Sequence, residues 1–414
     1  MGTSPKTNTF YGWKLSFLSL FSNFLILGSS VYLMNAFIEP FTALYGWNRG
    51  EMGLIMGIGS FCGLASTPLF SSLAMRASLR SIMLGGAIAG GLSLFLLGQF
   101  SNIWLFGINF AVLWIAGQAC GGPITNALMS NWFIRYRGRA FGIASCGMSC
   151  SGAILPFAAF ILLKFFTVQT STEIIGIFVL VTLVPAVWFF VRDTPESMGL
   201  LPDGVKPQGE SVPHKDTDTS EAPSINELLR SPLVWRIGFA FTIMLTAGAG
   251  VMSQLKPRFS DLGFNDVTAM GFMCATAFCT ACSKYVWGWL ADRFSPVTTT
   301  RVLCLYSAVA FLLAFLPPSL PALAAFSLFC GLAMGGYWTC LPAVVVNVFG
   351  RTHFMGVYRV ISLFIFFKAV GYIIMGKSHQ YTGSYDAAFI VFCALFVLAF
   401  LLMPKEGIKY KNGL

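Results

Sequence analysis

Long apolar runs without charged residues constrain this chain more than any other feature of its sequence. Residues 15–38, 52–74 and 81–99 each approach or exceed the roughly 20 residues that an α-helix needs to cross a ~30 Å hydrocarbon core. A water-soluble domain must cover its outside with polar groups, whereas lipid solvates an apolar outer face. Here 56% of the 414 residues are hydrophobic and only 10% are charged. The sequence therefore predicts a polytopic membrane protein.

Twelve membrane spans fit the sequence, in two sets of six. One long polar segment, residues 192–230, separates the two sets and is rich in Pro, Asp, Glu, Ser and Lys. We expect this segment to be a mobile cytoplasmic linker between an N-terminal bundle, residues 1–191, and a C-terminal bundle, residues 231–414. The predicted spans cover residues 15–38, 52–74, 81–99, 103–129, 140–163, 173–191, 233–255, 267–290, 301–316, 321–348, 360–378 and 385–403.

The net charge of +10 could indicate a nucleic-acid partner, but the positions of the cations favour another interpretation. Of the 26 Lys and Arg residues, nineteen lie on loops and ends of one side of the predicted spans and five on the other. The remaining two lie inside apolar runs. Such alternation is the positive-inside bias of membrane proteins. It predicts an integral plasma membrane protein of the bacterial inner-membrane type, with both termini cytoplasmic, the lipid bilayer around it and no nucleic-acid partner.

Motifs for enzymatic chemistry are absent from the sequence. There is no Gly-rich phosphate loop, no HExxH and no Ser-His-Asp set, and the three His residues fall outside the predicted spans. The eleven Cys residues are scattered, mostly through apolar runs, where Cys is usually a small hydrophobe. We therefore expect neither an enzyme nor an ATP-driven pump, and no cofactor or metal site. An ion or solute gradient would supply the energy.

The two cations inside apolar runs are the strongest candidates for a binding site. Lys284 lies eight residues before Asp292, and Lys368 lies nine residues after Arg359. At 1.5 Å per residue, both fall ~12–13.5 Å from one membrane face, near the middle of a ~30 Å core. A lysine at this depth costs about 2.5–3.5 kcal/mol on insertion scales and normally faces a cavity, a partner or a substrate. No Asp or Glu lies in the middle of a span, so these lysines predict an anion site, with a packing or gating role as the alternative.

Neighbouring side chains at helical spacing extend this candidate site. Thr276 and Thr280 precede Lys284 at intervals of four residues, and Tyr372 follows Lys368 after four. Aromatic residues elsewhere could complete the cavity wall or simply pack between helices. These candidates are Tyr32, Trp338, Trp114 and Tyr337, with the polar Gln118 beside them.

A duplicated turn motif gives the chain its resemblance to a known family. After the eighth span stands Gly288-Trp-Leu-Ala-Asp292-Arg293, and after the second stands Ser71-Ser-Leu-Ala-Met75-Arg76, followed by Arg80. An Asp and an Arg in a sharp turn can lock neighbouring helices through charge and helix-dipole contacts. The motif resembles the signature of the major facilitator superfamily, although the first copy lacks the initial Gly and the Asp. The resemblance implies an all-α membrane fold, with two six-helix bundles around a central cavity that opens alternately to each side.

Three further motifs narrow the resemblance. They are Tyr11-Gly12-Trp13, Asn131-Trp-Phe-Ile-Arg-Tyr-Arg-Gly-Arg-Ala-Phe-Gly142 and Arg192-Asp-Thr-Pro-Glu-Ser-Met-Gly-Leu-Leu-Pro-Asp-Gly204. Together they resemble the branch that holds the oxalate–formate exchangers and the monocarboxylate transporters. The resemblance implies a substrate-binding cation at Lys284, where the family typically has Arg, and a second at Lys368, with aromatic partners at Tyr32 and Trp338. Monocarboxylate carriers place an Asp one turn before their cation, where this chain has Thr280.

These features predict a secondary transporter of small organic anions, either mono- or dicarboxylates. Two unpaired ammonium groups make an empty cavity costly to reorient, which favours exchange (antiport). Proton-linked symport, with protons as a second partner, stays open because a buried lysine can also carry a proton. One alternative is a carrier of a larger amphipathic cargo, such as an iron-chelate importer or a drug efflux protein. Another is a membrane receptor or scaffold that does not transport.

Overall fold

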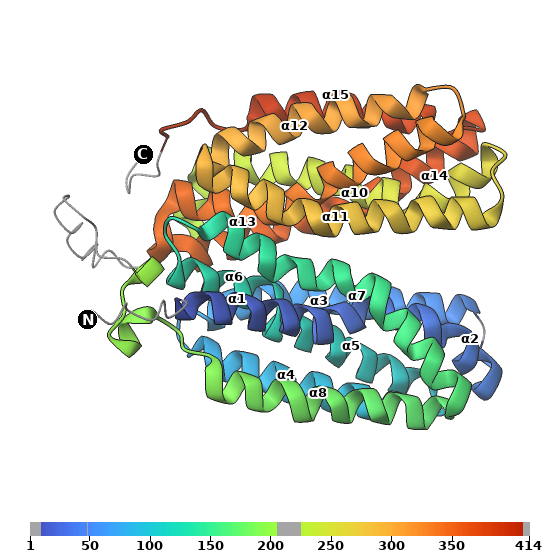
Figure 1. The fold of residues 1–414 in the computed structure, drawn as a ribbon, viewed down its shortest axis with the longest axis horizontal. Helices are drawn as coiled ribbons and strands as arrows, with labels where there is room; N and C mark the ends of the chain where they lie inside the picture. Colours follow the sequence, from blue (N-terminus) through green and yellow to red (C-terminus); the bar gives the residue numbers. More distant parts are fainter. Residues whose placement is uncertain (1–9, 48, 205–224, 409–414) are drawn as a thin grey trace, which may run out of the picture.

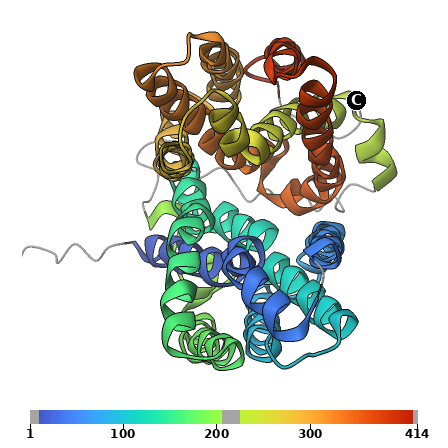
Figure 2. The ribbon, with the colours of Figure 1, turned by 90° about the vertical axis from the view of Figure 1, so that its right-hand side faces the viewer.

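The computed structural model describes residues 10–47, 49–204 and 225–408, and this part of the chain contains helices and turns but no strand. Figure 1 shows two stacked groups of long, near-parallel helices, with both termini at one end. From the opposite end, in Figure 2, the blue-to-green helices form one bundle and the yellow-to-red helices form the other. The predicted all-α fold of two bundles is confirmed.

The N-terminal bundle has an interrupted first span. It consists of α1 (Tyr11–Ser22), the π-helical turns η1 (Asn23–Leu27) and η2 (Ser29–Leu33), and α2 (Met34–Tyr45). Turns of π-helix are rare and often lie at functional sites. The other spans are α3 (Arg49–Leu73), α4 (Leu79–Leu96), α5 (Ile103–Cys120) continued by α6 (Gly122–Trp132), α7 (Arg137–Phe165) and α8 (Val168–Phe190).

The C-terminal bundle follows the short helix α9 (Ile225–Arg230). Within α13, Gly350 has φ 80° and ψ 171°. Glycine adopts this backbone conformation readily, and it separates the tenth span from the eleventh. The elements are α10 (Pro232–Asp261), α11 (Asp266–Arg293), α12 (Pro296–Leu312) with η5 (Leu313–Phe315), α13 (Leu320–Ile365), the 3₁₀ turn η6 (Phe366–Ala369), α14 (Val370–Thr382) and α15 (Asp386–Leu402).

Most of these helices are long and apolar enough to cross a membrane. Nine stretches of the described residues qualify by length and composition, and one of them, Leu320–Thr382, is 63 residues long and holds two spans. Helices α11 and α15 complete the twelve. α15 is apolar but has only 17 residues, and α11 is less apolar because it carries Lys284 and several hydroxyl side chains.

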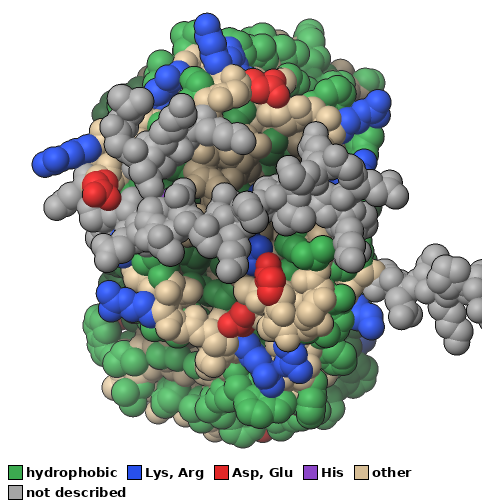
Figure 3. All heavy atoms as spheres, turned by 90° about the vertical axis from the view of Figure 1, so that its left-hand side faces the viewer, with side chains coloured by type: hydrophobic (Ala, Val, Ile, Leu, Met, Phe, Trp, Pro, Cys, Tyr) green, Lys and Arg blue, Asp and Glu red, His purple; other side chains and the backbone are tan. Residues whose placement is uncertain are grey.

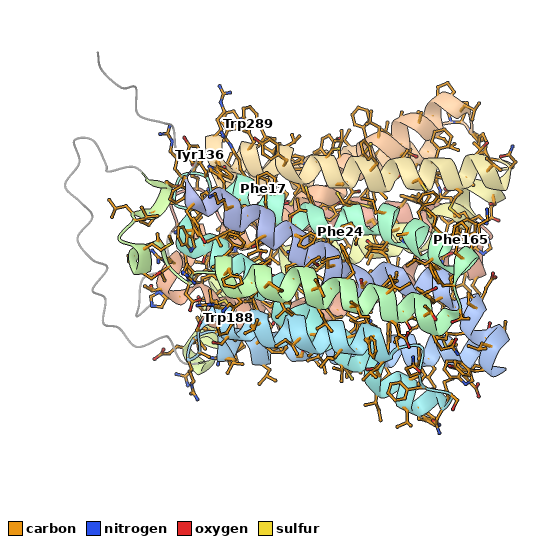
Figure 4. The ribbon with its side chains drawn as sticks, turned by 60° about the horizontal axis from the view of Figure 1, so that its bottom comes forward. Phe17, Phe24, Tyr136, Phe165, Trp188 and Trp289 are labelled. Carbon is orange, nitrogen blue, oxygen red and sulfur yellow. The ribbon has the colours of Figure 1, made fainter. Side chains whose placement is uncertain are left out.

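The outside of the molecule suits a lipid environment. Large apolar side chains project outward, among them Phe157 and Val181, which are 64% and 67% exposed. In Figure 4, Tyr136, Trp188 and Trp289 lie toward the end that carries the termini, and Phe165 lies at the opposite end. Aromatic residues near both ends are typical of the two membrane–water interfaces.

Asn23 connects the interrupted first span to two neighbouring helices. Its side chain is 4% exposed and donates hydrogen bonds to the Ser19 carbonyl (2.9 Å), the Thr125 hydroxyl (3.2 Å) and the Ala144 carbonyl (3.1 Å). Its Oδ1 atom accepts from the backbone N–H of Gly122 at 3.1 Å. A buried amide is tolerated when its donors and acceptors are paired. Asn23 therefore holds η1 against α6 and α7, beside the space between the bundles.

The first part of the predicted linker is folded against the N-terminal bundle. The short 3₁₀ turns η3 (Pro195–Met198) and η4 (Pro202–Gly204) lie in it. Asp193 accepts hydrogen bonds from the first backbone N–H groups of α4, at 3.0 and 3.1 Å. Asp203 accepts from the backbone N–H groups of Ile134 and Arg135, at 2.9 and 2.6 Å. Residues 192–204 are therefore packed against the N-terminal bundle, because their carboxylates supply acceptors that exposed N–H groups need. The mobility of the linker stays a prediction, and residues 205–224 lie outside the described part.

Glu196, on η3, joins this segment to the other bundle. Its carboxylate lies 3.2 Å from Arg351, between the tenth and eleventh spans, and Arg351 also donates to the Asn131 side chain at 3.3 Å. Partial burial is the largest single influence on Glu196 and opposes its ionisation, but the hydrogen bonds from Arg351, Thr194 and the Glu196 backbone, together with the charge of Arg351, outweigh it and lower the pKa of the carboxyl group. The Glu196 carboxylate is half exposed, so we expect this bridge to add little stability but to mark where the bundles meet.

We predict that Asn23→Leu lowers the thermal stability of the detergent-purified protein by about 1–3 kcal/mol, the usual cost of leaving buried hydrogen-bonding groups unpaired. Differential scanning fluorimetry measures this as a fall in melting temperature. Asn109→Leu is the matched control, because Asn109 is also buried but donates only to Ser93. If the control destabilises the protein more, Asn23 is not the connecting residue that we describe.

Candidate functional site

A cavity of about 400 Å³ lies between the two bundles. Six of the predicted site residues line it. Four come from the C-terminal bundle, namely Lys284 from α11, Trp338 from α13, Lys368 from η6 and Tyr372 from α14, and two come from α5 of the N-terminal bundle, namely Trp114 and Gln118. Among the described residues that line the cavity, no side chain is acidic. The two lysines therefore give the cavity a net positive charge.

Lys284 reaches across to the N-terminal bundle. Its side chain is buried, and its Nζ atom donates a hydrogen bond to the backbone carbonyl of Ser145 on α7 at 2.7 Å. Close by, the Cys146 thiol donates to the carbonyl of Ala281 at 3.0 Å. The partner of the ammonium group is thus a neutral carbonyl dipole, which leaves the charge without a counter-ion. Lys284 therefore also joins the two bundles, which is the kind of contact expected of a lysine with a packing or gating role.

Lys368 has a different environment. It lies in the 3₁₀ turn η6, and its Nζ atom is 5.4 Å from the centre of the Trp338 ring. This cation–π contact stabilises an ammonium group without neutralising it. Tyr372 follows one turn later and is 47% exposed. The 3₁₀ turn brings Lys368 to the cavity wall between α13 and α14, where an anion could replace water around its charge.

Four predicted residues, Tyr32, Thr276, Thr280 and Tyr337, are not among those that line this cavity. Tyr32 lies on η2 and is partly buried, and its ring packs close to Gly152 on α7. Thr280 donates its hydroxyl to the Thr276 carbonyl at 2.8 Å, within its own helix. Tyr337 is buried inside the C-terminal bundle, where its hydroxyl donates to Ser307 at 3.0 Å. Thr276, Thr280 and Tyr337 thus face their own helix or bundle, whereas Tyr32 lies close enough to the cavity residue Tyr372 for the two phenol groups to interact electrostatically.

The wall on the N-terminal side is neutral. Trp114 and Gln118, on α5, line it together with Thr67, on α3, and Asn126, on α6. Thr67 donates to the Oε1 atom of Gln118 at 3.2 Å, and Asn126 donates to the Tyr358 hydroxyl of the other bundle at 3.4 Å. The sequence does not predict Thr67, Asn126 or Ser145 as site residues. Their only sequence signal is a small polar side chain in an apolar run, which many structural residues share.

Asp292 locks α11 to α7 at the end that carries the termini. Its carboxylate accepts hydrogen bonds from the backbone N–H groups of Gly138 (2.5 Å) and Arg139 (3.0 Å), at the start of α7. The Arg139 side chain is 3.6 Å away. A carboxylate at a helix N-terminus is favoured by the unpaired N–H groups and by the helix dipole. Gly138 and Gly288 allow this contact, since a Cβ atom on either would collide with the carbonyl group of the other.

The first copy of the turn motif makes a weaker contact. Met75 stands where the second copy has Asp, and its sulfur would lie 3.8 Å from a Cβ atom on Gly356, in α13. Beside it, Arg359 of α13 donates to the Ser72 hydroxyl at 3.1 Å. The contact between α3 and α13 therefore lacks the carboxylate cap that joins α7 to α11.

The arginines of the two turns do not cross to the other bundle. Arg76 is exposed, Arg80 stacks on Trp188 at 4.8 Å, and Arg293 stacks on Trp289 at 5.4 Å. Of the five predicted turn residues, Gly288 and Asp292 alone make the described contacts between bundles. The inter-bundle hydrogen bonds of the described residues run from the end that carries the termini to about the middle of the spans, where Lys284 and Cys146 make the deepest ones, so the bundles are joined on that side of the cavity.

Comparisons with known proteins agree with this architecture. The family model described as Major Facilitator Superfamily matches residues 16–358 and 261–407. Among curated proteins, the chain is 25% identical over 385 residues to Monocarboxylate transporter 12 of Mus musculus, covering 86% of this chain and 78% of that protein. It is 22% identical over 294 residues to the Glycerol-3-phosphate transporter of Bacillus subtilis (strain 168), covering 67% and 65%.

Solved structures share the fold. The Major Facilitator Superfamily transporter FucP in the outward conformation superposes with a TM-score of 0.71 at 16% identity, covering 95% of this chain and 98% of that one. The human organic anion transporter MFSD10 (TETRAN) gives 0.70 at 16% identity, covering 96% and 100%. The chain belongs to the Major Facilitator Superfamily. It is therefore an integral membrane transporter and not an enzyme.

We predict that Asp292→Asn loosens the closed end of the cavity, because a neutral amide is a poorer acceptor for helix N-terminal N–H groups. Losing a charge-assisted bond of about 1.5–3 kcal/mol should raise the rate of maleimide labelling at Cys146 about tenfold, measured peptide by peptide with mass spectrometry. Asp203→Asn is the control, since Asp203 caps backbone groups within its own bundle. Equal labelling rates in wild type and D292N would contradict the lock.

Proposed function

We propose that this chain is a secondary transporter of small organic anions, which bind by a carboxylate group in the central cavity. One observation carries the proposal: two lysines line the cavity and no acidic side chain among the described lining residues neutralises them. A positive charge in a low-dielectric cavity attracts an anion far more strongly than it does in water. It also disfavours cationic cargo.

The relatives support this substrate class. The names of the curated relatives concern monocarboxylates and glycerol 3-phosphate, both of which are acidic solutes. The low identities leave the particular solute open. Mono- and dicarboxylates therefore remain the proposed substrates, while a larger amphipathic cargo remains the rival proposal.

The orientation in the membrane follows from charge. Figure 3 shows Lys and Arg side chains gathered around the face that carries the termini, with apolar side chains on the flanks. By the positive-inside bias, this face is cytoplasmic, in a plasma membrane of the bacterial inner-membrane type. The contacts of Asp292 and Lys284 then close the cytoplasmic side, and the described state is outward-facing. Transport would require these contacts to break as the bundles rock about the bound anion.

Coupling to a gradient follows from the same two charges. An empty cavity with two lysines is costly to carry through the membrane, whereas a bound anion offsets that charge. We therefore propose obligate exchange of one anion for another. Proton-linked symport is the competing mechanism.

We predict that Lys368→Ala and Lys284→Ala each abolish uptake of a labelled monocarboxylate into proteoliposomes that contain an internal anion. Lys377→Ala is the matched control, because Lys377 is exposed at the other end of the eleventh span and contacts Tyr381 instead of the cavity. All three variants should insert and purify as monodisperse protein. Near wild-type uptake by both cavity variants would place the anion site elsewhere or favour a non-transporting protein.

We predict that uptake into proteoliposomes without internal anion is at least tenfold slower than uptake into preloaded ones. The reason is that the unloaded carrier should reorient slowly with two uncompensated charges. The assay is run with and without an imposed pH gradient. Rapid accumulation into empty vesicles that follows the pH gradient would exclude exchange and favour proton-linked symport, while leaving the anion site in place.

A further inference from the structure

The two walls of the cavity differ in charge, and this difference bears on the shape of the cargo. Both cations, Lys284 and Lys368, belong to the C-terminal bundle, whereas the wall of the N-terminal bundle carries no charged residue among the described ones. A carboxylate would therefore bind on one side. The opposite wall is left to contact the remainder of the molecule.

Gln118 is the polar group of the neutral wall that is best placed to bind a ligand. It is buried to 8% exposure and lines the cavity. The Thr67 hydroxyl donates to its Oε1 atom at 3.2 Å, which orients the amide. Among the described residues, its NH₂ group has no hydrogen-bond partner. Asn23, in contrast, uses its Nδ2 and Oδ1 atoms to hold η1 in place, so it has no comparable role.

Trp114 lies beside Gln118 in the same wall. It lies one helical turn before Gln118 on α5 and also lines the cavity, so the two side chains share one helix face. Its indole N–H is fully buried and has no hydrogen-bond partner among the described residues, so in this conformation the N–H group does not reach the cavity. The Gln118 amide is therefore the donor of this wall that can meet an acceptor atom of a ligand.

The cavity has room for a cargo longer than two carbons. About 400 Å³ corresponds to roughly thirteen times the ~30 Å³ that one water occupies in the liquid. A two-carbon dianion bound between the lysines would leave the donor of the neutral wall to water. A second carboxylate against that wall would lack a cation, which is unfavourable at low dielectric. A neutral acceptor, such as a ketone or amide oxygen, meets neither difficulty.

We propose that the cargo is an elongated monocarboxylate with a neutral acceptor oxygen at the end remote from its carboxylate, and that Gln118 selects this oxygen. The proposal rests on the anion site of the proposed function. Lys368 holds the carboxylate, and Gln118, with Trp114 beside it, receives the acceptor oxygen across the cavity. Gln118 is thus the residue that determines specificity, while the lysines determine the sign of the charge.

Binding of three acids to the purified protein tests the proposal. The probes are 5-oxohexanoate, hexanoate and oxalate, with dissociation constants measured by isothermal titration calorimetry. Wild type should bind 5-oxohexanoate about fivefold more tightly than hexanoate, as expected for one net hydrogen bond, and both more tightly than oxalate. In Gln118→Leu the ratio between the first two acids should fall to about one. This ratio is measured within one preparation, so it does not depend on the fraction of folded protein.

Thr67→Val is a second variant that leaves Gln118 in place. Without the donor that orients its amide, the preference for 5-oxohexanoate should fall below that of wild type. Three results would overturn the proposal while leaving the anion site in place. They are equal binding of 5-oxohexanoate and hexanoate by wild type, the same preference in Q118L as in wild type, and tighter binding of oxalate than of either other acid. Lys368→Ala should weaken all three acids alike. If wild type binds none of them, the proposed function falls, and this inference falls with it.

Discussion

The capping of α7 by Asp292 is the interaction on which the described state depends. It joins an element of each bundle through backbone N–H groups, so it fixes the position of one helix relative to the other as well as their proximity. Glycines at 138 and 288 let the two backbones approach. The same helix pair places Lys284 beside the Ser145 carbonyl two turns further in. The Asp292 cap and the Lys284–Ser145 contact beside the cavity are therefore parts of one contact between α11 and α7.

Much of the fold could be predicted because the lipid bilayer constrains the length and the composition of the helices that cross it. Apolar runs of bilayer length predict spans, and the positions of Lys and Arg predict an orientation. The two lysines could be placed because a charge in an apolar run is rare and costly, so depth alone identifies it. The packing of the segment that holds Asp193 and Asp203 could not be predicted. The composition of this segment is that of a linker, and its two carboxylates accept hydrogen bonds from backbone N–H groups that are far away in sequence.

The limits of the site prediction have a different cause. Helical spacing assumes a constant rotation per residue, but the π-helical turns near Tyr32 and the 3₁₀ turn at Lys368 change it. Thr280 shares spacing with Lys284, yet its hydroxyl is used by its own helix. The contact between Lys284 and Ser145 involves a backbone carbonyl, which every residue has. The sequence carries no signal for that partner, nor for Thr67 and Asn126 in the opposing wall, although it does give Trp114 and Gln118 of that wall as candidates.

Lys284 links binding to gating in the proposed mechanism. An ammonium group has three N–H donors, and one is used by the Ser145 carbonyl that helps to close the cavity. A carboxylate is a stronger acceptor than a neutral carbonyl, because a charge-assisted hydrogen bond is roughly twice as strong. An anion that enters beside Lys284 can use the two remaining donors, and it competes with the contact between the bundles only where it draws the ammonium group away from Ser145. The further the bound anion draws Lys284 from the Ser145 carbonyl, the weaker the contact between the bundles at the end that carries the termini would become. The charge that attracts the cargo would therefore also link binding to the opening of the cavity at that end.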